Sequence, residues 1–438
     1  MSQPPPGPPA PANSAAMPAP APRPAPAPGA APVQTAGRDA ATPLSQREWG
    51  PDIARGIALL GIAVANMYYY LHSSTPGPFM KPEGSTGASL GVDVATVLLF
   101  DNRGFTLFSL LFGYGIGMLY ARSQRRGESK GQFMLHMLAR HGLLLAIGVL
   151  HAVLLFAGDI IVTYALLGII VAALAIAPRW VRIVVLVLTV PALLFMGVMD
   201  SMSLALNDDA FAMSGQPDTT VTFLGALGFR LIALLFVVLG LPFLSIGILV
   251  PMLIGLALQR WGFFGKARER MGLMAGIAAG GVLISLLGAL PAAWAVIEQP
   301  QLGWLAASGI GALHQLTGLA GAVGYAALAA IVGVWRPAVL FPLAALGTMS
   351  MSAYLFQSVV AVTIYPAWAF GVGGWISSWG AFWISLGTWL ATVVIATLLL
   401  KAGKRGPVEW LFRRVLYGAP AAPAAPAAAS VDPLAGPR

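Results

Sequence analysis

Long apolar runs, separated by short polar loops, repeat along the chain from about residue 47 to residue 418. Most runs hold about 20 residues, which is enough for a helix to cross the hydrocarbon core of a bilayer. The pattern predicts an all-α integral membrane protein, a polytopic bundle of about ten transmembrane helices. The crossings are expected at 53–71, 105–120, two within 140–177, one ending near Met199, one within 222–258, and at 271–290, 305–334, 341–365 and 378–400.

The stretch 222–258 is too long for one crossing, since a continuous helix over it would span about 55 Å. Pro242 and Pro251 interrupt it, and proline inside a helix removes a backbone donor. We expect a partly interfacial piece around Arg230, followed by one crossing. Between the first two crossings, a short apolar run at 90–100 ends in a polar break, Asp101 to Gly104.

Basic residues gather in alternate loops. The loops at 122–130, 178–182, 260–270 and 401–405 hold most of the arginine and lysine, whereas the intervening loops hold Lys81 and Arg103. By the positive-inside rule, the basic loops and both termini are cytoplasmic. The net charge of +9 therefore indicates orientation in a bacterial plasma (inner) membrane, with the lipid bilayer and not nucleic acid as the partner.

Composition supports this class and restricts the chemistry. Hydrophobic residues make up 58% of the chain and charged residues 9%, with a mean hydropathy of +0.79. The absence of cysteine excludes disulfides, thiolate nucleophiles and iron–sulfur clusters. Histidine and carboxylate spacings typical of metal sites do not occur on a predicted helix face, so we predict no metal site.

Both ends of the chain differ from the apolar middle. Residues 1–46 are rich in proline and alanine, and residues 419–438 are similar. Such segments bury too little apolar surface to offset their conformational entropy. We expect two disordered tails, the N-terminal one cytoplasmic, flanking one polytopic domain at 47–418.

The most informative polar residues are His151 and Asp159, because ionisable groups near membrane depth are costly. In one continuous helix they would lie about 80° and about 12 Å apart, out of contact. Gly158 permits the chain to turn back and bring Asp159 towards the histidine. Asp159 also suits the N-cap of the next helix, and His151 suits a neutral interior histidine, so structural and chemical roles are both open.

Other polar residues in apolar surroundings are candidates for supporting roles. Arg103 is expected either to form an ion pair with Asp101 or Asp159, or to stabilise an anionic group in a cavity. Arg140 shares a helix face with His151 but lies at the cytoplasmic end, where its head group can reach water. The remaining supporting candidates are Arg55, Asn66, Tyr164 and Gln357.

Five blocks occur in the same order as in a known family. They are RGIALLGIAVANMY (55–68), FSLLFGYGIGM (108–118), GVLHAVLLFAGDIIVTYALLG (148–168), GTMSMSAYLFQS (347–358) and GPVEWLFRRVLYG (406–418). The chain therefore resembles the YeiB-like bacterial membrane proteins, which are described as domain of unknown function 418. Ile161 departs from the leucine that this family commonly has after Gly-Asp-Ile, a conservative change. The resemblance implies a remote relation to multi-pass acyltransferases, which use cytoplasmic acyl-CoA to modify an acceptor on the other side of the membrane.

Three functions fit these residues. In an acyltransferase that modifies an envelope sugar or lipid, His151 would be the base, Asp159 would orient it, and Arg103 would stabilise charge. In a proton-coupled or anionic-solute transporter, the same residues would carry protons or bind the solute. In a scaffold, they would only pack helices. The sequence contains no convincing inverted repeat, which favours the enzyme, and it determines neither the substrate nor the oligomeric state.

Overall fold

The structure is a computed structural model that describes Met1, Gln3 and residues 48–72, 75–206, 222–240, 245–335 and 338–417. The two expected tails lie outside these residues, apart from Met1 and Gln3. Between 48 and 417 the described chain is built from helices, as the apolar periodicity predicts. The helices are α1 (Trp49–Asn66), α2 (Gly87–Leu99), α3 (Gly104–Arg125), α4 (Lys130–Leu154), α5 (Ile161–Ile176), α6 (Arg179–Asp200), α8 (Phe223–Gly240), α9 (Leu249–Trp261), α10 (Met271–Glu298), α11 (Trp304–Trp335), α12 (Phe341–Thr348), α13 (Ser350–Ile364), α14 (Ser378–Lys401) and α15 (Pro407–Tyr417).

Many of these helices are suited to a bilayer, which confirms an all-α polytopic membrane protein. Within the described chain, eight helices are long and apolar enough to cross a membrane, or up to nine if the pair α12 and α13, bent by 86°, forms one span. Ile161–Ile176 and Ile246–Trp261 are shorter apolar helices. Ten crossings and cytoplasmic termini stay predictions.

The stretch 222–258 differs in detail from the expectation. The piece around Arg230 forms α8, an 18-residue helix that is itself apolar enough to span, and a separate helix α9 follows. Pro251 lies in the first turn of α9 and does not break it. Proline is tolerated there because the first backbone N–H groups of a helix have no partner within the helix.

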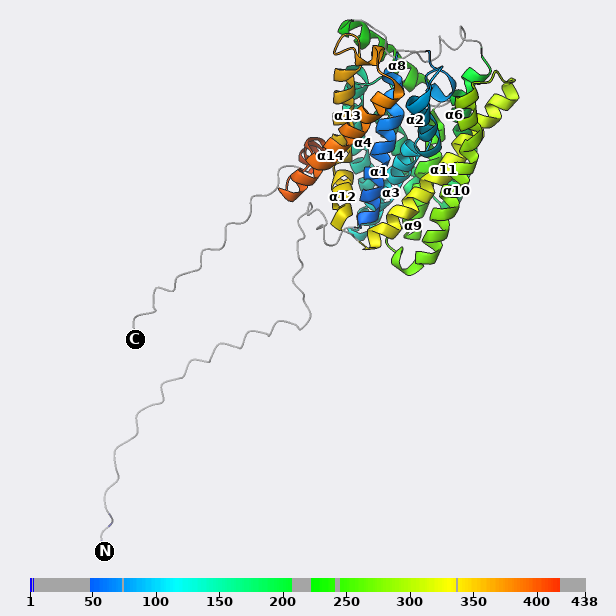
Figure 1. Ribbon diagram of the computed structural model, residues 1–438. Coiled ribbons are helices and arrows are strands. Elements are labelled where there is room, and N and C mark those ends of the chain that lie inside the picture. Colours follow the sequence, from blue (N-terminus) through cyan, green and yellow to red (C-terminus); the bar gives the residue numbers. More distant parts are fainter. Residues whose placement is uncertain are drawn as a thin grey trace. The chain divides into compact units, whose positions relative to one another are not determined.

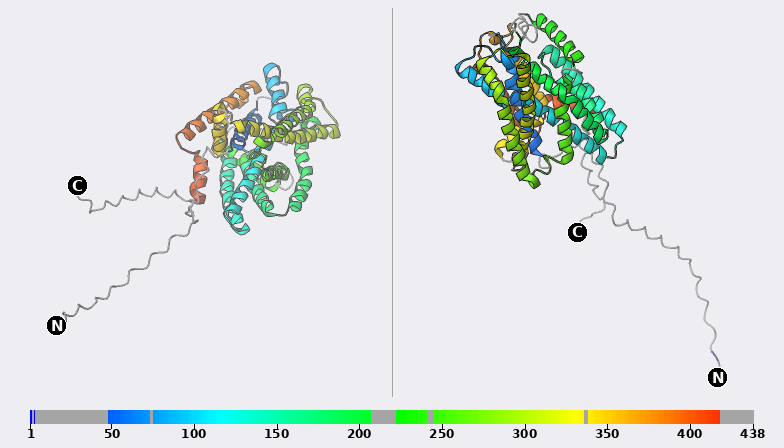
Figure 2. Two further views of the ribbon diagram at one scale, coloured as in Figure 1. Left: turned by 90° about the horizontal axis from the view of Figure 1, so that it is seen from below. Right: turned by 90° about the vertical axis from the view of Figure 1, so that its right-hand side faces the viewer.

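Helix α1 contacts α3, α11, α12 and α14, while α10 and α11 pair along their lengths (Figures 1 and 2). Glycine permits the closest contacts, as the small residues of GYGIG predict. A side chain at Gly113 of α3 would clash with the Met252 carbonyl of α9, and one at Gly255 of α9 would clash with the Leu110 carbonyl of α3. These two glycines therefore set the separation of α3 and α9.

The last helix, α15, docks on the first turn of α13. Met349, the N-cap residue of α13, offers no side-chain cap. Glu409 of α15 supplies the missing acceptor, because its Oε1 accepts from the backbone N–H groups of Met351 at 2.9 Å and Ser352 at 3.2 Å. A carboxylate at this position satisfies unpaired donors and the positive end of the helix dipole.

Candidate functional site

Three side chains meet inside the bundle, two of them eight residues apart and the third far along the chain. His151 Nδ1 lies 2.7 Å from Asp159 Oδ1, and His151 Nε2 lies 2.8 Å from Ser358 Oγ. The side chain of His151 is 0% exposed and that of Asp159 is 2% exposed. These two contacts, carboxylate to imidazole and imidazole to hydroxyl, are those of a Ser–His–Asp triad. In such a triad a buried carboxylate orients an imidazole that faces a hydroxyl.

The loop after α4 brings Asp159 to the histidine. Helix α4 ends at Leu154, one turn after His151, and the chain reverses before α5 begins at Ile161. Asp159 Oδ2 then accepts from the backbone N–H of Val162 at 2.7 Å, so one oxygen serves the first turn of α5 and the other serves His151. The capping role and the histidine contact, both open from the sequence, coexist in one carboxylate.

A glycine allows the two helices to approach at this point. A side-chain carbon placed on Gly148 of α4 would lie 2.8 Å from the Val162 nitrogen and 3.1 Å from the Ile161 carbonyl carbon. Gly148 precedes His151 by three residues, so it lies about one turn below the histidine. The distance between His151 and Asp159 therefore depends on a glycine at 148.

Ser358 was given no role by the sequence reasoning. It is the last residue of the block 347–358, and it lies in the middle of α13, 207 positions from His151. Its Oγ also lies 3.3 Å from the carbonyl of Tyr354 on its own helix. The only sequence signal for a functional role of Ser358 was its place at the end of that block. The signal is weak, because a serine inside an apolar helix more often bonds its own backbone.

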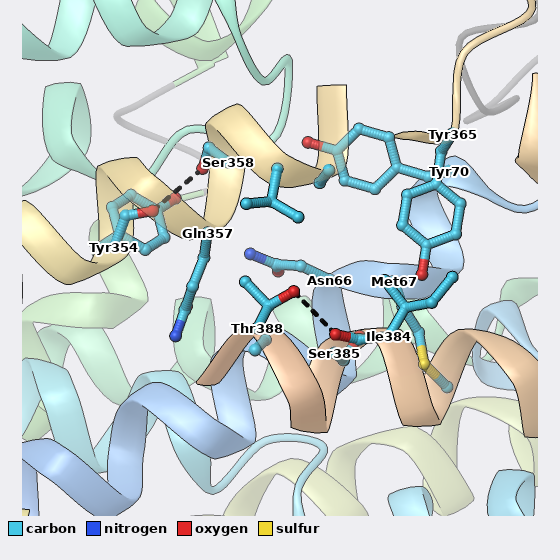
Figure 3. Close-up of a pocket in the computed structure, with 13 residues that line it drawn as sticks. Asn66, Met67, Tyr70, Tyr354, Gln357, Ser358, Tyr365, Ile384, Ser385 and Thr388 are labelled. Carbon is cyan, nitrogen blue, oxygen red and sulfur yellow. Dashed lines mark hydrogen bonds between the residues drawn. The ribbon is translucent and has the colours of Figure 1, made fainter. Parts of the chain in front are cut away.

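Ser358 opens onto a pocket whose empty space, counted together with the open solvent at its mouth, is about 430 Å³. The pocket lies between the end of α1 with the turn that follows it, α13 and α14 (Figure 3). Figure 3 shows Tyr354 and Gln357 at one end and Tyr70 and Tyr365 at the other. Ser358 is among the lining residues whereas His151 is not, so the histidine lies behind the serine. The lining residues are Ala63, Asn66, Met67, Tyr70, Tyr354, Gln357, Ser358, Val360, Ala361, Tyr365, Ile384, Ser385 and Thr388.

One lining residue, Gln357, holds a buried amide without a partner. Gln357 is 8% exposed, and neither its Oε1 nor its Nε2 forms a hydrogen bond within the described chain. A buried polar group without a partner costs about 1–3 kcal/mol, so such groups call for an explanation. Asn66, the other predicted amide, lines the same pocket.

Arg103 belongs to a different buried cluster. It is 0% exposed, and its guanidinium donates to Ser285 Oγ at 2.8 Å, to the Ser285 carbonyl at 2.8 Å and to His314 Nε2 at 2.8 Å. The Asp101 carboxylate accepts from Lys81 Nζ at 2.7 Å. The two carboxylates expected to pair with Arg103 thus bind other residues: Asp101 binds Lys81, and Asp159 binds His151. Arg103 instead links α3 to α10 and α11.

The hydrogen bonds and ring contacts of the other supporting candidates are made with residues outside the triad. Arg55 forms an ion pair with Asp52 at 3.0 Å in α1. The Arg140 guanidinium lies 5.5 Å from the ring centre of Phe412 in α15. Tyr164 lies with its hydroxyl 2.5 Å from Ser109 Oγ. Across the described residues, no group of three or more His, Cys, Asp or Glu side chains could hold a metal ion.

The fold and these contacts define a polytopic α-helical membrane protein with a buried triad beside a pocket. Residues 258–419 match the family model described as Protein of unknown function (DUF418). The predicted resemblance to the YeiB-like family is confirmed by this match together with the relatives that follow.

Two relatives are similar to the chain. Uncharacterized protein YeiB of Escherichia coli (strain K12) is 27% identical over 394 residues, which cover 83% of this chain and 94% of that protein. Uncharacterized protein YxaH of Bacillus subtilis (strain 168) is 31% identical over 125 residues, 27% of this chain and 30% of that protein. No solved structure gives a significant match.

Proposed function

We propose that this protein is a membrane acyltransferase that carries the acyl group on Ser358 and delivers it to a hydroxyl of an envelope sugar or lipid. One observation supports this function above all. Both ring nitrogens of the buried His151 are engaged, and the hydroxyl of Ser358 lies between His151 and the pocket. The base therefore acts through the serine, a residue to which the sequence-based hypothesis gave no role.

The hydrogen bonds assign the tautomer of His151. An ionised Asp159 can only accept, so Nδ1 carries the proton and donates to Asp159 Oδ1. Nε2 is then free of a proton and accepts from the Ser358 hydroxyl. This is the protonation state in which an imidazole activates a serine nucleophile.

The donor would be an acyl thioester such as acyl-CoA. Ser358 Oγ attacks the carbonyl carbon while its proton passes to His151 Nε2; the C–S bond breaks, and the thiol leaves with that proton. An acceptor hydroxyl then gives its proton to His151 and attacks the acyl-serine ester. The bond between the acyl carbon and Ser358 Oγ breaks, and Oγ takes the proton back from His151 Nε2.

The pocket amides suit the charge that develops during transfer. The carbonyl oxygen becomes an oxyanion in each tetrahedral intermediate and is stabilised by preorganised N–H donors. Gln357 Nε2 has no hydrogen-bond partner among the residues that the structure describes, and Asn66 lines the same space. Loss of one such donor lowers kcat by about 10²–10³-fold in well-studied hydrolases. Arg103, engaged elsewhere, has no part in this mechanism.

The charge pattern indicates the side of the membrane. Helix α4 begins at Lys130, in a loop that the positive-inside rule assigns to the cytoplasm, and His151 lies in its last turn. The triad is therefore expected in the outer half of the bilayer. An acceptor in the envelope fits this position.

Labelling with a fluorophosphonate tests the activated serine, because such probes phosphonylate nucleophilic serines. Purified protein is treated with the probe and the modified peptide is identified by mass spectrometry. We expect modification at Ser358, at least 100-fold slower in His151→Ala and absent in Ser358→Ala. Thr363→Val is the matched control, since Thr363 Oγ1 lies on the same helix and bonds the Val359 carbonyl.

Two results would overturn the proposal. Labelling that persists in Ser358→Ala would mean that another serine is the nucleophile. Unlabelled wild-type protein that nevertheless moves protons or an anion across proteoliposomes would favour the transporter, in which His151 and Asp159 carry protons without the serine.

A further inference from the structure

We infer that the pocket beside Ser358 binds an uncharged, hydroxyl-rich head group, such as a neutral sugar, and discriminates against anionic head groups. That this ligand is the acyl acceptor rests on the proposed function. The inference adds the chemical class of that acceptor. Binding itself is independent of acyl transfer, so the two proposals can fail separately.

The polar groups of the pocket are amides and hydroxyls. Asn66 comes from α1, Gln357 from α13, and Ser385 and Thr388 from α14, so they surround the space from three elements (Figure 3). Amides offer donors and acceptors together, and hydroxyls do the same. A ligand with several hydroxyls is complementary to this set, because each hydroxyl both donates and accepts.

Gln357 requires such a partner. Its carbonyl oxygen and its NH₂ group are both buried and both lack a hydrogen bond within the described chain. A polyol would satisfy the two at once, with one hydroxyl donating to Oε1 and a neighbouring one accepting from Nε2. Gln315 of α11, which is 0% exposed, has an amide that also lacks a hydrogen bond within the described chain, and it does not line this pocket, which makes it a control.

Charge separates a neutral head group from an anionic one. The thirteen residues that line the pocket include no Lys, Arg, His, Asp or Glu. An anion buried there would lose its hydration without gaining a cation, at a cost of several kcal/mol. Behind the serine lies the carboxylate of Asp159, which pairs with His151 and would repel a phosphate or carboxylate.

The apolar walls of the pocket suit the C–H faces of a sugar ring. Tyr70 and Tyr365 stack with ring centres 5.5 Å apart at one end, and Met67 and Ile384 add apolar surface. Tyrosine presents an apolar ring and a polar hydroxyl, which matches a sugar with C–H faces and O–H edges.

Ligand-observed NMR tests the inference. The full-length protein is purified in a polyoxyethylene detergent, which contains no sugar, and saturation transfer is measured to methyl glycosides of glucose and galactose, each beside its uronic acid counterpart. We expect at least one neutral glycoside to bind at least tenfold more tightly than its uronide. Gln357→Leu should weaken that binding about tenfold, while Gln315→Leu leaves it unchanged.

Ser358→Ala separates this inference from the proposed function. The variant loses the nucleophile but keeps the pocket, so it should bind the neutral glycoside within about threefold of wild type. Glycoside binding in a protein that the fluorophosphonate does not label would support the pocket inference and refute the nucleophile. Uronides that bind as tightly as neutral glycosides, or binding equally sensitive to both glutamine changes, would overturn the inference even if Ser358 is labelled.

Discussion

Asp159→Asn separates the two roles of one carboxylate. The asparagine oxygen can still accept from the Val162 N–H, which Asp159 Oδ2 does at 2.7 Å, so the start of α5 keeps its cap. The NH₂ group then faces His151 Nδ1, 2.7 Å away in the wild type, and a donor there stabilises the opposite tautomer. His151 Nε2 would carry the proton and could no longer accept the proton of Ser358.

The size of each effect follows from the contacts above and from the same change in a well-studied triad. The wrong tautomer is worth about 10⁴-fold in kcat when the same change is made in the trypsin triad, so the labelling rate of Ser358 should fall by about 10³–10⁴-fold. The free energy of unfolding should fall by less than about 1 kcal/mol, because the cap and the side-chain volume are preserved. Asp159→Ala removes the cap as well and leaves His151 Nδ1–H unpaired, which adds about 1–3 kcal/mol of destabilisation.

The measurement is the pseudo-first-order rate of fluorophosphonate labelling, with thermal unfolding in the same detergent as the control for folding. His151→Ala combined with Asp159→Asn should label no more slowly than His151→Ala alone, since the two residues act as a unit. An Asp159→Asn rate within tenfold of wild type would refute the reasoning. The carboxylate would then serve α5 only, and His151 would not depend on it.

The remaining predictions concern topology, the N-terminal tail, the second buried cluster and helix spacing. Reporter fusions after Arg126 and Asp209 should give opposite signals, and equal signals would contradict the ten-helix topology. Removal of residues 1–44 should leave the melting temperature in detergent unchanged, because the segment has no apolar face to dock. Arg103→Ala should destabilise the protein by about 3 kcal/mol or more, since it leaves several buried acceptors unpaired, while the labelling rate per folded molecule stays within threefold. Gly148→Ala should slow labelling by about 10–100-fold and lower the melting temperature, because the added methyl group meets the Val162 backbone nitrogen and must displace the start of α5, at a cost of about 1–3 kcal/mol.

The sequence was informative where contacts are local. The helices follow from apolar run length, whereas Gly158 permitted the meeting of His151 and Asp159 without requiring it. The same locality explains the dual role of Asp159, whose contact with Val162 spans three residues.

Contacts between distant helices could not be predicted in this way. Ser358 is 207 positions from His151, and Ser285 is 182 positions from Arg103. Periodicity gives the buried face of each helix but not which helix lies against it, and in lipid that choice depends on small-residue packing that many pairings satisfy. The break between α12 and α13, an 86° bend, falls at Gly347, Thr348 and Ser350, and hydrophobic run length alone did not distinguish this polar interruption from a continuous crossing over 341–365.

The contact of Glu409 with the first turn of α13 has a consequence for biosynthesis. The acceptor for the Met351 N–H lies 58 positions later in the chain, so α13 leaves the ribosome well before its cap is made. Until α15 follows, the backbone donors of Met351 and Ser352 must be satisfied by water or by the insertion machinery. The first turn of α13, the helix that carries Ser358, therefore gains its cap only after α14 has been synthesised. A nascent chain that stops before residue 409 contains all three triad residues but lacks the Glu409 carboxylate that caps α13.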